Sequence, residues 1–149
     1  MTKPLHILIV EDNDDDVVLI EAAFTDGSLQ ASYDVVRDGE EAMTYLRHEA
    51  EYDRARRPDL ILLDINMPRK NGFEVLDELK QDPELKYLPV IMLTTSNRDS
   101  DILQAYAQGA ASYLVKPQHF DELRAMALKL HDYWGAVSRL PEVLTAPAH

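Results

Sequence analysis

Short apolar segments recur along the chain at regular intervals, and longer segments with helical spacing separate them. Five of the short segments have the length of a β-strand: His6–Val10, Tyr33–Val36, Asp59–Leu63, Pro89–Leu93 and Ser112–Val115. All except the second are almost continuous in Ile, Leu and Val, which is typical of parallel strands covered on both faces. The segments that follow them space apolar residues three and four positions apart, as Val17, Ile20 and Phe24 do, which predicts a helix after each strand.

Strict alternation of strands and helices predicts the α/β class, with a doubly wound parallel sheet of five strands. With right-handed crossovers, the commonest strand order for such a sheet is 2-1-3-4-5. The 149 residues have the size of one domain. We expect residues 1–132 to form that domain and residues 133–149 to extend the last helix and add a tail.

Composition narrows the classes of function. The chain has 15 basic and 27 acidic residues, a net charge of -12, and no Cys. This charge argues against binding to nucleic acid or to anionic membranes. The lack of Cys excludes disulfides, thiolate zinc sites and a Cys nucleophile. We find no signal peptide and no membrane span in the sequence, and we expect a cytoplasmic protein.

Candidate chemistry gathers at the carboxyl ends of the predicted strands. In the order 2-1-3-4-5, ligands bind where connectivity reverses, between strands 1 and 3. Strand 1 runs into Glu11 and Asp12, and strand 3 runs into Asp64. Three carboxylates with no His or Cys beside them favour Mg2+, or Mn2+, over zinc. We interpret Asp14–Asp16 as charges of the first helical turn, which the helix dipole stabilises.

The last two strands add complementary groups at the same edge. Strand 4 ends in the hydroxyl of Thr94, and strand 5 ends in the ammonium of Lys116. A metal, an ammonium and a hydroxyl together form a cradle for a phosphoryl group. The acceptor would be Asp64, because a carboxylate oxygen can attack phosphorus in line.

In this combination the chain resembles the receiver domain of bacterial two-component response regulators. The residues that carry the resemblance are Glu11, Asp12, Asp64, Asn66, Pro68, Gly72, Thr94 and Lys116-Pro117. The resemblance covers roughly residues 5–130. It implies the flavodoxin-like, CheY-like receiver fold and a single-domain response regulator that takes a phosphoryl group from a histidine kinase. Such a protein is not an enzyme beyond catalysing its own phosphorylation and dephosphorylation.

The resemblance also implies a role for each site residue. Asp64 is the phosphoacceptor, and Lys116 and Thr94 assist the transfer. Asp12, Asp64 and the main-chain carbonyl of Asn66 bind Mg2+ or Mn2+, and Glu11 contributes through water. Thr94 is also a switch residue, together with Tyr113.

Finer features resemble the regulators paired with bacterial and cyanobacterial phytochrome kinases. They include Leu93-Thr94-Thr95-Ser96, Ser112-Tyr113 and the long last helix. They imply a phytochrome-type histidine kinase as the partner.

Other functions remain open at this point. A phosphatase of the haloacid dehalogenase type also uses an Asp nucleophile, but its general acid would stand where this chain has Asn66. A pseudo-receiver that only binds partners is excluded by no motif. A flavodoxin-like electron carrier would need a phosphate-binding loop after strand 1, where the acidic Glu11 and Asp12 stand.

The end of the chain suggests self-association. The last helix continues its apolar stripe to Trp134 and Val137, and we expect this half to extend past the sheet and to leave Trp134 exposed. We therefore expect a homodimer, because isologous dimers dominate small assemblies. The residues expected at the contact are Leu128, Trp134, Val137, Leu140 and Leu144.

Overall fold

Five parallel strands alternate with five α-helices in the computed structural model, which describes residues 4–25, 29 and 31–140. The strands are β1 (Leu5–Val10), β2 (Ala31–Val36), β3 (Leu60–Leu63), β4 (Val90–Thr94) and β5 (Ser112–Val115). The helices are α1 (Asp14–Phe24), α2 (Gly39–Leu46), α3 (Gly72–Gln81), α4 (Asp99–Ala107) and α5 (Phe120–Asp132). A 3-10 turn, η1 (Ala50–Tyr52), follows α2, and a π-helical turn, η2 (Tyr133–Val137), continues from α5.

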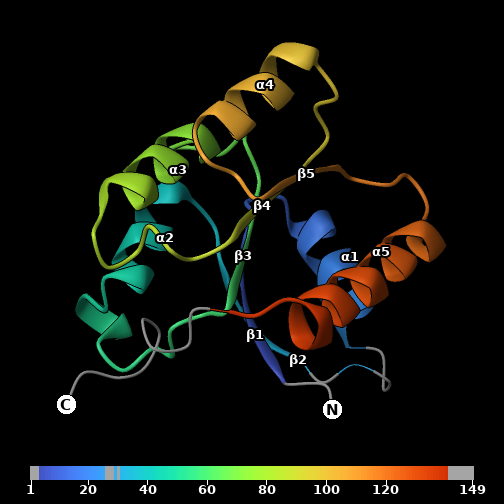
Figure 1. The fold of residues 1–149 in the computed structure, drawn as a ribbon, viewed down its shortest axis with the longest axis horizontal. Coiled ribbons are helices and arrows are strands. Elements are labelled where there is room, and N and C mark those ends of the chain that lie inside the picture. Colours follow the sequence, from blue (N-terminus) through green and yellow to red (C-terminus); the bar gives the residue numbers. More distant parts are fainter. Residues whose placement is uncertain (1–3, 26–28, 30, 141–149) are drawn as a thin grey trace.

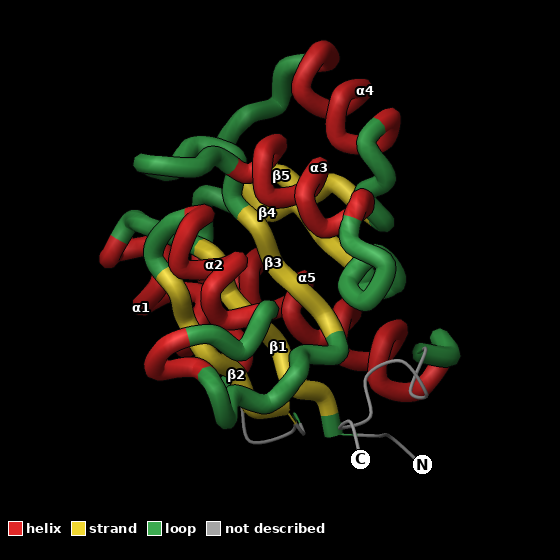
Figure 2. The backbone as a smooth tube through the Cα atoms, turned by 90° about the vertical axis from the view of Figure 1, so that its left-hand side faces the viewer, coloured by secondary structure: helices red, strands yellow, loops and turns green. Residues whose placement is uncertain are grey.

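The strands form one parallel sheet in the order β2-β1-β3-β4-β5, which confirms the predicted topology. Helices α1 and α5 cover one face of this sheet, and α2 and α3 cover the other, with α4 beside β5 (Figures 1 and 2). The register pairs Val10 with Leu63, the last residues of β1 and β3. The polar residues that follow these two strands are therefore neighbours.

The central and edge strands differ in burial. Every residue of β1, β3 and β4 is buried, as their continuous apolar sequences predict. In β5 no residue is fully buried, and Val115 is exposed. The expectation that β5 is covered on both faces is therefore wrong: β5 lies at the edge of the sheet, where the helices cover it only in part.

Side-chain caps fix where three helices begin, in the loops that follow β1, β2 and β3. Asn13 accepts a hydrogen bond from the backbone N–H of Asp16 at the start of α1. Asp38 caps α2, and Asn71 caps α3 in a capping box with Glu74. These caps satisfy backbone donors that the first helical turn leaves unpaired.

The segment after α5 differs from its prediction. A π-helical turn inserts an extra residue per turn and rotates the apolar stripe. Trp134, four residues after Leu130, stays on the stripe that faces the core: it is half-buried and packs beneath α1 and α5, so the expectation of an exposed Trp is wrong. Leu140 packs on the same core and Leu128 is half-buried, whereas Val137 is 70% exposed. Leu144 lies outside the described residues.

None of the helices in the described part of the chain is long and apolar enough to span a membrane.

Candidate functional site

The site begins where β1 and β3 end side by side. Backbone hydrogen bonds continue one residue past each strand: Glu11 N–H donates to the carbonyl of Val36, and Asp64 N–H donates to the carbonyl of Val10. The sheet thus holds the main chain of both acidic residues. Their side chains project from a rigid edge rather than from a free loop.

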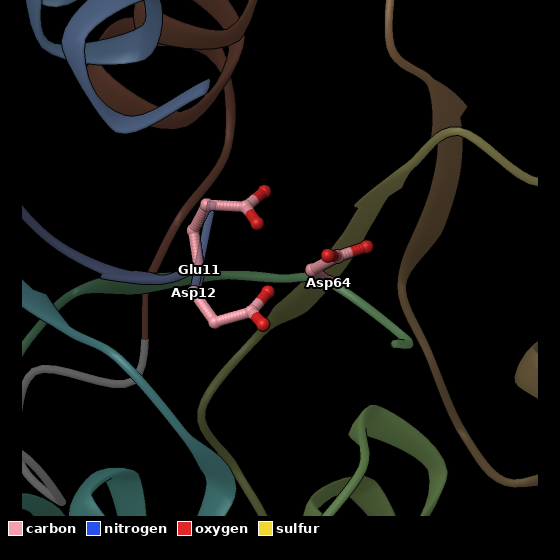
Figure 3. Close-up of side chains that lie close together, drawn as sticks. All are labelled: Glu11, Asp12 and Asp64. Atoms are coloured by element: carbon pink, nitrogen blue, oxygen red, sulfur yellow. The ribbon is translucent and has the colours of Figure 1, made fainter. Parts of the chain in front are cut away.

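Three carboxylates meet at this edge. Glu11, Asp12 and Asp64 each offer a ligand oxygen, and these oxygens lie within 4.8 Å of one another (Figure 3). Glu11 and Asp64 are buried and Asp12 is exposed. Burial and, to a smaller extent, the charge of Asp64 raise the pKa of Glu11 to about 7, against the hydrogen bond from Lys116. The predicted convergence of the three acids is therefore observed.

Among the described residues, Lys116 supplies the one ammonium group that contacts Glu11 and Asp64. Its Nζ donates a hydrogen bond to Glu11, and it lies 3.7 Å from Asp64 Oδ2. Nζ also donates to Asp16 Oδ2 at 2.8 Å. Burial opposes the charge of Lys116, but its hydrogen bonds to Asp16 and Glu11 and the charge of Asp64 outweigh burial and raise its pKa.

The contact with Asp16 was missed in the sequence, where Asp16 was interpreted as a charge of the first helical turn. It does occupy that turn, but its carboxylate reaches the ammonium at the end of β5. The available signal was weak, because neighbouring Asp14 and Asp15 have the same side chain. Asp14 pairs instead with Arg37.

Thr94 ends β4 as predicted, and its side chain is fully buried. Its hydroxyl oxygen has no hydrogen-bond partner in the described protein. An unpaired buried hydroxyl carries a desolvation cost, and such a group is common where a ligand completes the site. The backbone carbonyl of Thr94 accepts from the N–H of Lys116, which brings both residues to one edge.

Tyr113 is half-buried on β5, and its contacts lead away from the carboxylates. Its hydroxyl donates to the carbonyl of Ser96 at 2.8 Å. Its N–H donates to the hydroxyl of Tyr106 at 3.2 Å. Tyr113 therefore contacts the loop between β4 and α4 at Ser96, two residues after Thr94.

The loop from β3 to α3 returns tightly over Asp64. Gly72 N–H donates to the carbonyl of Ile65 at 2.8 Å. A Cβ at Gly72 would lie 2.3 Å from the backbone oxygen of Asp64, so only glycine permits this approach. Asn66 lies in this loop, exposed, two residues after Asp64.

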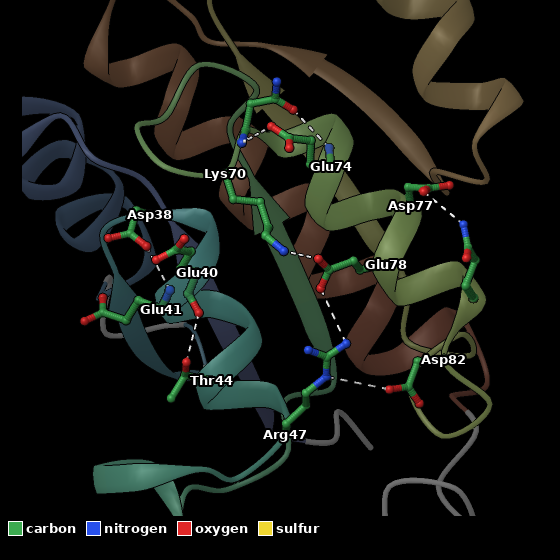
Figure 4. A network of polar contacts seen from close by, with 12 residues as sticks. Asp38, Glu40, Glu41, Thr44, Arg47, Lys70, Glu74, Asp77, Glu78 and Asp82 are labelled. Carbon is green, nitrogen blue, oxygen red and sulfur yellow. Dashed lines mark hydrogen bonds and ion pairs between the residues drawn. The ribbon is translucent and has the colours of Figure 1, made fainter.

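Ion pairs that were not foreseen in the sequence tie the same loop to α2 and α3. Arg69, whose φ of 64° is left-handed, pairs with the buried Asp38 that caps α2. Lys70 pairs with Glu78 of α3, and Glu78 also contacts Arg47, the residue directly after α2, at 3.4 Å (Figure 4). These contacts fasten the loop that carries Asn66.

The donor set fits a hard divalent cation. Carboxylate oxygens are the ligands that Mg2+ and Mn2+ prefer, and zinc sites usually include His or Cys. Within residues 4–25, 29 and 31–140, Glu11, Asp12 and Asp64 form the only group of three such side chains close enough to share an ion. A cation would also relieve the repulsion among these carboxylates.

Comparison with protein families gives a match over most of the chain. A model of the "Response regulator receiver domain" matches residues 7–128. Response regulator Rcp1 of Synechocystis sp. is 38% identical over 138 residues, which cover 93% of this chain and 94% of Rcp1.

Solved structures agree with this match. The phosphorylated cyanobacterial phytochrome response regulator RcpA is 42% identical, with a TM-score of 0.86, over 92% of this chain and 98% of RcpA. The Mn(2+)-bound form of Rcp1 superimposes with a TM-score of 0.84 over 93% of this chain and 99% of that one. RPA3017, a response regulator in red light signaling of R. palustris, is 33% identical, with a TM-score of 0.86, over 92% of this chain and 98% of its own.

Proposed function

The chain belongs to the response regulator receiver family, and we propose that it is a phosphorylation switch in which Asp64 accepts a phosphoryl group from a histidine kinase. The observation that carries this proposal is the setting of Asp64. Its buried carboxylate faces two further acids and lies 3.7 Å from the ammonium of Lys116. Such a setting suits an oxygen nucleophile beside charges that can neutralise a phosphoryl group.

The transfer exchanges one bond to phosphorus for another. A lone pair of an Asp64 carboxylate oxygen forms the new O–P bond, while the P–N bond of the kinase phosphohistidine breaks. The imidazole nitrogen keeps the electron pair of that bond and takes up a proton from solvent. Hydrolysis of the acyl phosphate later restores the Asp64 carboxylate and releases inorganic phosphate.

The remaining site residues serve this transfer in distinct ways. Lys116 would neutralise phosphoryl oxygens, and the unpaired Thr94 hydroxyl would donate to one of them. Asp12, Asp64 and the main-chain carbonyl of Asn66 would hold Mg2+ or Mn2+, with Glu11 reaching it through water. The bound cation would supply positive charge to the transferring group. That Rcp1 has a Mn(2+)-bound form supports this assignment.

A change in the position of Thr94 would alter the position of Tyr113, and so the nearby surface of the protein. Its hydroxyl is already bonded to the loop that follows Thr94, through Ser96. A movement of Thr94 toward a phosphoryl group would pull on this loop and change the contacts of Tyr113.

We propose a phytochrome-type histidine kinase as the partner. RcpA is a phytochrome response regulator and RPA3017 acts in red light signaling, and both match nearly the full length of this chain. The proposed place of action is the cytoplasm, where ATP maintains the kinase phosphohistidine. Beyond its own phosphorylation and dephosphorylation, the chain would catalyse no reaction.

Intact mass after incubation with Mg2+ and acetyl phosphate tests the acceptor. The wild type should gain one phosphoryl group, and Asp64→Asn should gain none. Asp59→Asn, at the opposite end of the same strand, should be labelled like the wild type. Its side chain accepts from the N–H of His6 at 2.9 Å, which Asn can also do.

The same measurement separates the competing functions. Labelling of Asp64→Asn at the wild-type rate would refute the acceptor, and absence of labelling in the wild type would favour the pseudo-receiver. Sustained release of phosphate from phosphomonoesters would favour the phosphatase. We do not expect such turnover, because Asn66 cannot protonate a leaving alkoxide.

We also propose that the chain forms a homodimer through α5 and η2. A groove of about 720 Å³ lies between β5 and these helices, and its floor is largely apolar. Leu114, Met126, Leu130, Tyr133 and Trp134 are among its lining residues. Val137 lies on the same turn as Trp134 and is 70% exposed. A second copy that covers this face would bury apolar surface that monomers seldom expose.

Light scattering on the full chain and on Val137→Asp tests the dimer. The substitution places a charge on an exposed residue, so it should dissociate the dimer without unfolding the subunit. Val18→Asp is the matched control, because Val18 is 65% exposed on α1. Dimers in all three proteins, or monomers in all three, would refute the proposed contact.

A further inference from the structure

Lys116 is held by carboxylates from three separate elements. Glu11 follows β1, Asp16 belongs to the first turn of α1, and Asp64 follows β3. Nζ donates hydrogen bonds to Glu11 and to Asp16, but Asp64 Oδ2 lies 3.7 Å away, beyond hydrogen-bond distance. The resting ammonium is thus bonded to two acids and only faces the third.

The contact between Asp16 and Lys116 joins two fixed points of the fold. The backbone N–H of Asp16 donates to the side chain of Asn13 at 2.9 Å, which fixes the helical turn. The backbone N–H of Lys116 donates to the carbonyl of Thr94 at 2.8 Å, which fixes the strand end. The side chain of Lys116 is only 9% exposed, so it has little room to swing away.

The number of N–H donors on the ammonium indicates the role of the contact between Asp16 and Lys116. A lysine ammonium has three N–H donors. Glu11 and Asp16 take two of them, and the third is left for the side of Asp64. We propose that Asp16 is a positioning residue, which holds Lys116 so that its free N–H faces a phosphoryl group on Asp64. This role rests on the proposed function of Asp64.

Asp16 is better suited to this role than Glu11. Glu11 belongs to the three carboxylates that can share a cation, whereas Asp16 is outside that group. If Glu11 helped to hold a cation, its bond to Lys116 would weaken, and Asp16 would remain the fixed partner. The distance of 2.8 Å is that of a charge-assisted hydrogen bond, which is stronger and more directional than a neutral one.

The neighbouring acids provide a matched control. Asp15 carries the same charge on the same helical turn, and its side chain is exposed. Replacing Asp15 by Asn removes one negative charge near the site but leaves the contact of Asp16 with Lys116 intact. A general effect of charge would therefore appear in Asp15→Asn, and a positioning effect would not.

The first measurement is the rate of phosphorylation by acetyl phosphate at saturating Mg2+, followed by intact mass. We expect Asp16→Ala to be labelled roughly tenfold more slowly than the wild type, which corresponds to about 1.4 kcal/mol of transition-state stabilisation. Asp16→Asn keeps a hydrogen-bond acceptor and should fall between the two. Asp15→Asn should be labelled at the wild-type rate.

The second measurement is independent of phosphorylation. Proton exchange at the Lys116 ammonium can be followed by ¹⁵N NMR without Mg2+, with Lys116→Arg to assign the signal. Exchange should be slow in the wild type and in Asp15→Asn, and several-fold faster in Asp16→Ala. A residue that merely supports the fold would not change the exchange of this one group.

Different outcomes overturn different statements. Equal labelling of Asp16→Ala and the wild type would overturn the positioning role and leave the function of Asp64 intact. Equal slowing in Asp15→Asn, or unchanged ammonium exchange in Asp16→Ala, would also overturn it. A wild type that takes up no phosphoryl group would overturn the proposed function, and the positioning role with it.

Discussion

The two ends of the sheet both bury polar side chains, and they differ in how completely these side chains are paired. At the amino end, His6 of β1 faces Ser32 Oγ at 2.8 Å, Tyr45 Oη at 3.1 Å and Asp34 Oδ2 at 3.3 Å. Its backbone N–H donates to Asp59. Both ring nitrogens and the backbone donor of His6 therefore have partners.

The contacts at the amino end also assign the ring tautomer. Tyr45 donates its hydroxyl hydrogen to Asp34 at 2.6 Å, so it has none left for His6. His6 Nε2 must then carry a hydrogen, and in the neutral ring Nδ1 accepts from Ser32. A neutral histidine satisfies every contact at this end.

At the carboxyl end the pairing is incomplete. Glu11, Asp16 and Asp64 share one ammonium, and the buried hydroxyl of Thr94 has no partner in the described protein. The difference indicates that the polar contacts of the amino end stabilise the fold, whereas the unpaired groups of the carboxyl end are there to bind a ligand. Natural folds depart from full polar pairing mainly at such functional sites.

The largest effect should come from the cation that completes the carboxyl end. At a hundredfold excess over its Kd, a bound ion stabilises the native state by about 2.7 kcal/mol. Asp12→Ala removes a ligand and also relieves repulsion, so the metal-free variant should melt no lower than the wild type. It should then lose most of its rise in melting temperature with Mg2+. Asp15→Asn should keep that rise, and a variant at position 12 with the full wild-type rise would contradict the assignment.

A smaller loss of stability should follow from removing one of the polar contacts at the amino end of the sheet. Tyr45→Phe removes the hydroxyl that contacts His6, Asp34 and the carbonyl of Arg56. Unsatisfied buried groups would then cost about 1–3 kcal/mol of unfolding free energy, measured by urea denaturation. Tyr87→Phe, the same change at an exposed residue, should stay within about 0.5 kcal/mol of the wild type. Equal stability of the two variants would mean that the amino-end contacts are not stabilising.

Removing a hydroxyl at the carboxyl end of the sheet should, by contrast, not lower the unfolding free energy. Thr94→Val replaces the orphan hydroxyl by a methyl group of similar size, so unfolding free energy should stay level or rise by up to about 1 kcal/mol. The variant should nevertheless lose the response of the Tyr113 region to phosphorylation, seen in its NMR signals. Thr95→Val, at the exposed next residue, should keep that response. A clear loss of stability in Thr94→Val would show that the hydroxyl is already bonded.

The sequence predicted the carboxyl end better than the amino end. Parallel strands must deliver Glu11, Asp12 and Asp64 to one edge, so topology alone brings them together. The contact of Asp16 depends on how α1 is rotated against β5, which no local pattern encodes. His6 gave no signal either, because its partners come from β2 and α2 and its neighbours in sequence are apolar. The exposure of Trp134 was mispredicted because apolar spacing does not show how far along the last helix the packing on the core continues.

The smallest effect should be a pH dependence confined to the amino end. Burial lowers the pKa of His6 below its usual value near 6.5, even though the charge of Asp34 opposes the shift. The unfolded chain therefore binds a proton at His6 at a higher pH than the folded chain does. Stability from this group is fully present above pH 6.5 and is lost as the pH falls from there toward the folded pKa.

His6→Gln isolates this contribution, because the other titrating groups are common to both proteins. Between pH 7 and pH 5 the wild type should lose more unfolding free energy than His6→Gln, measured by urea denaturation at each pH. The imidazole of His6, followed by NMR in the folded protein, should titrate with a midpoint below 6.5. Parallel pH profiles of the two proteins would mean that the paired end tolerates the imidazolium, with Asp34 and Asp59 compensating its burial.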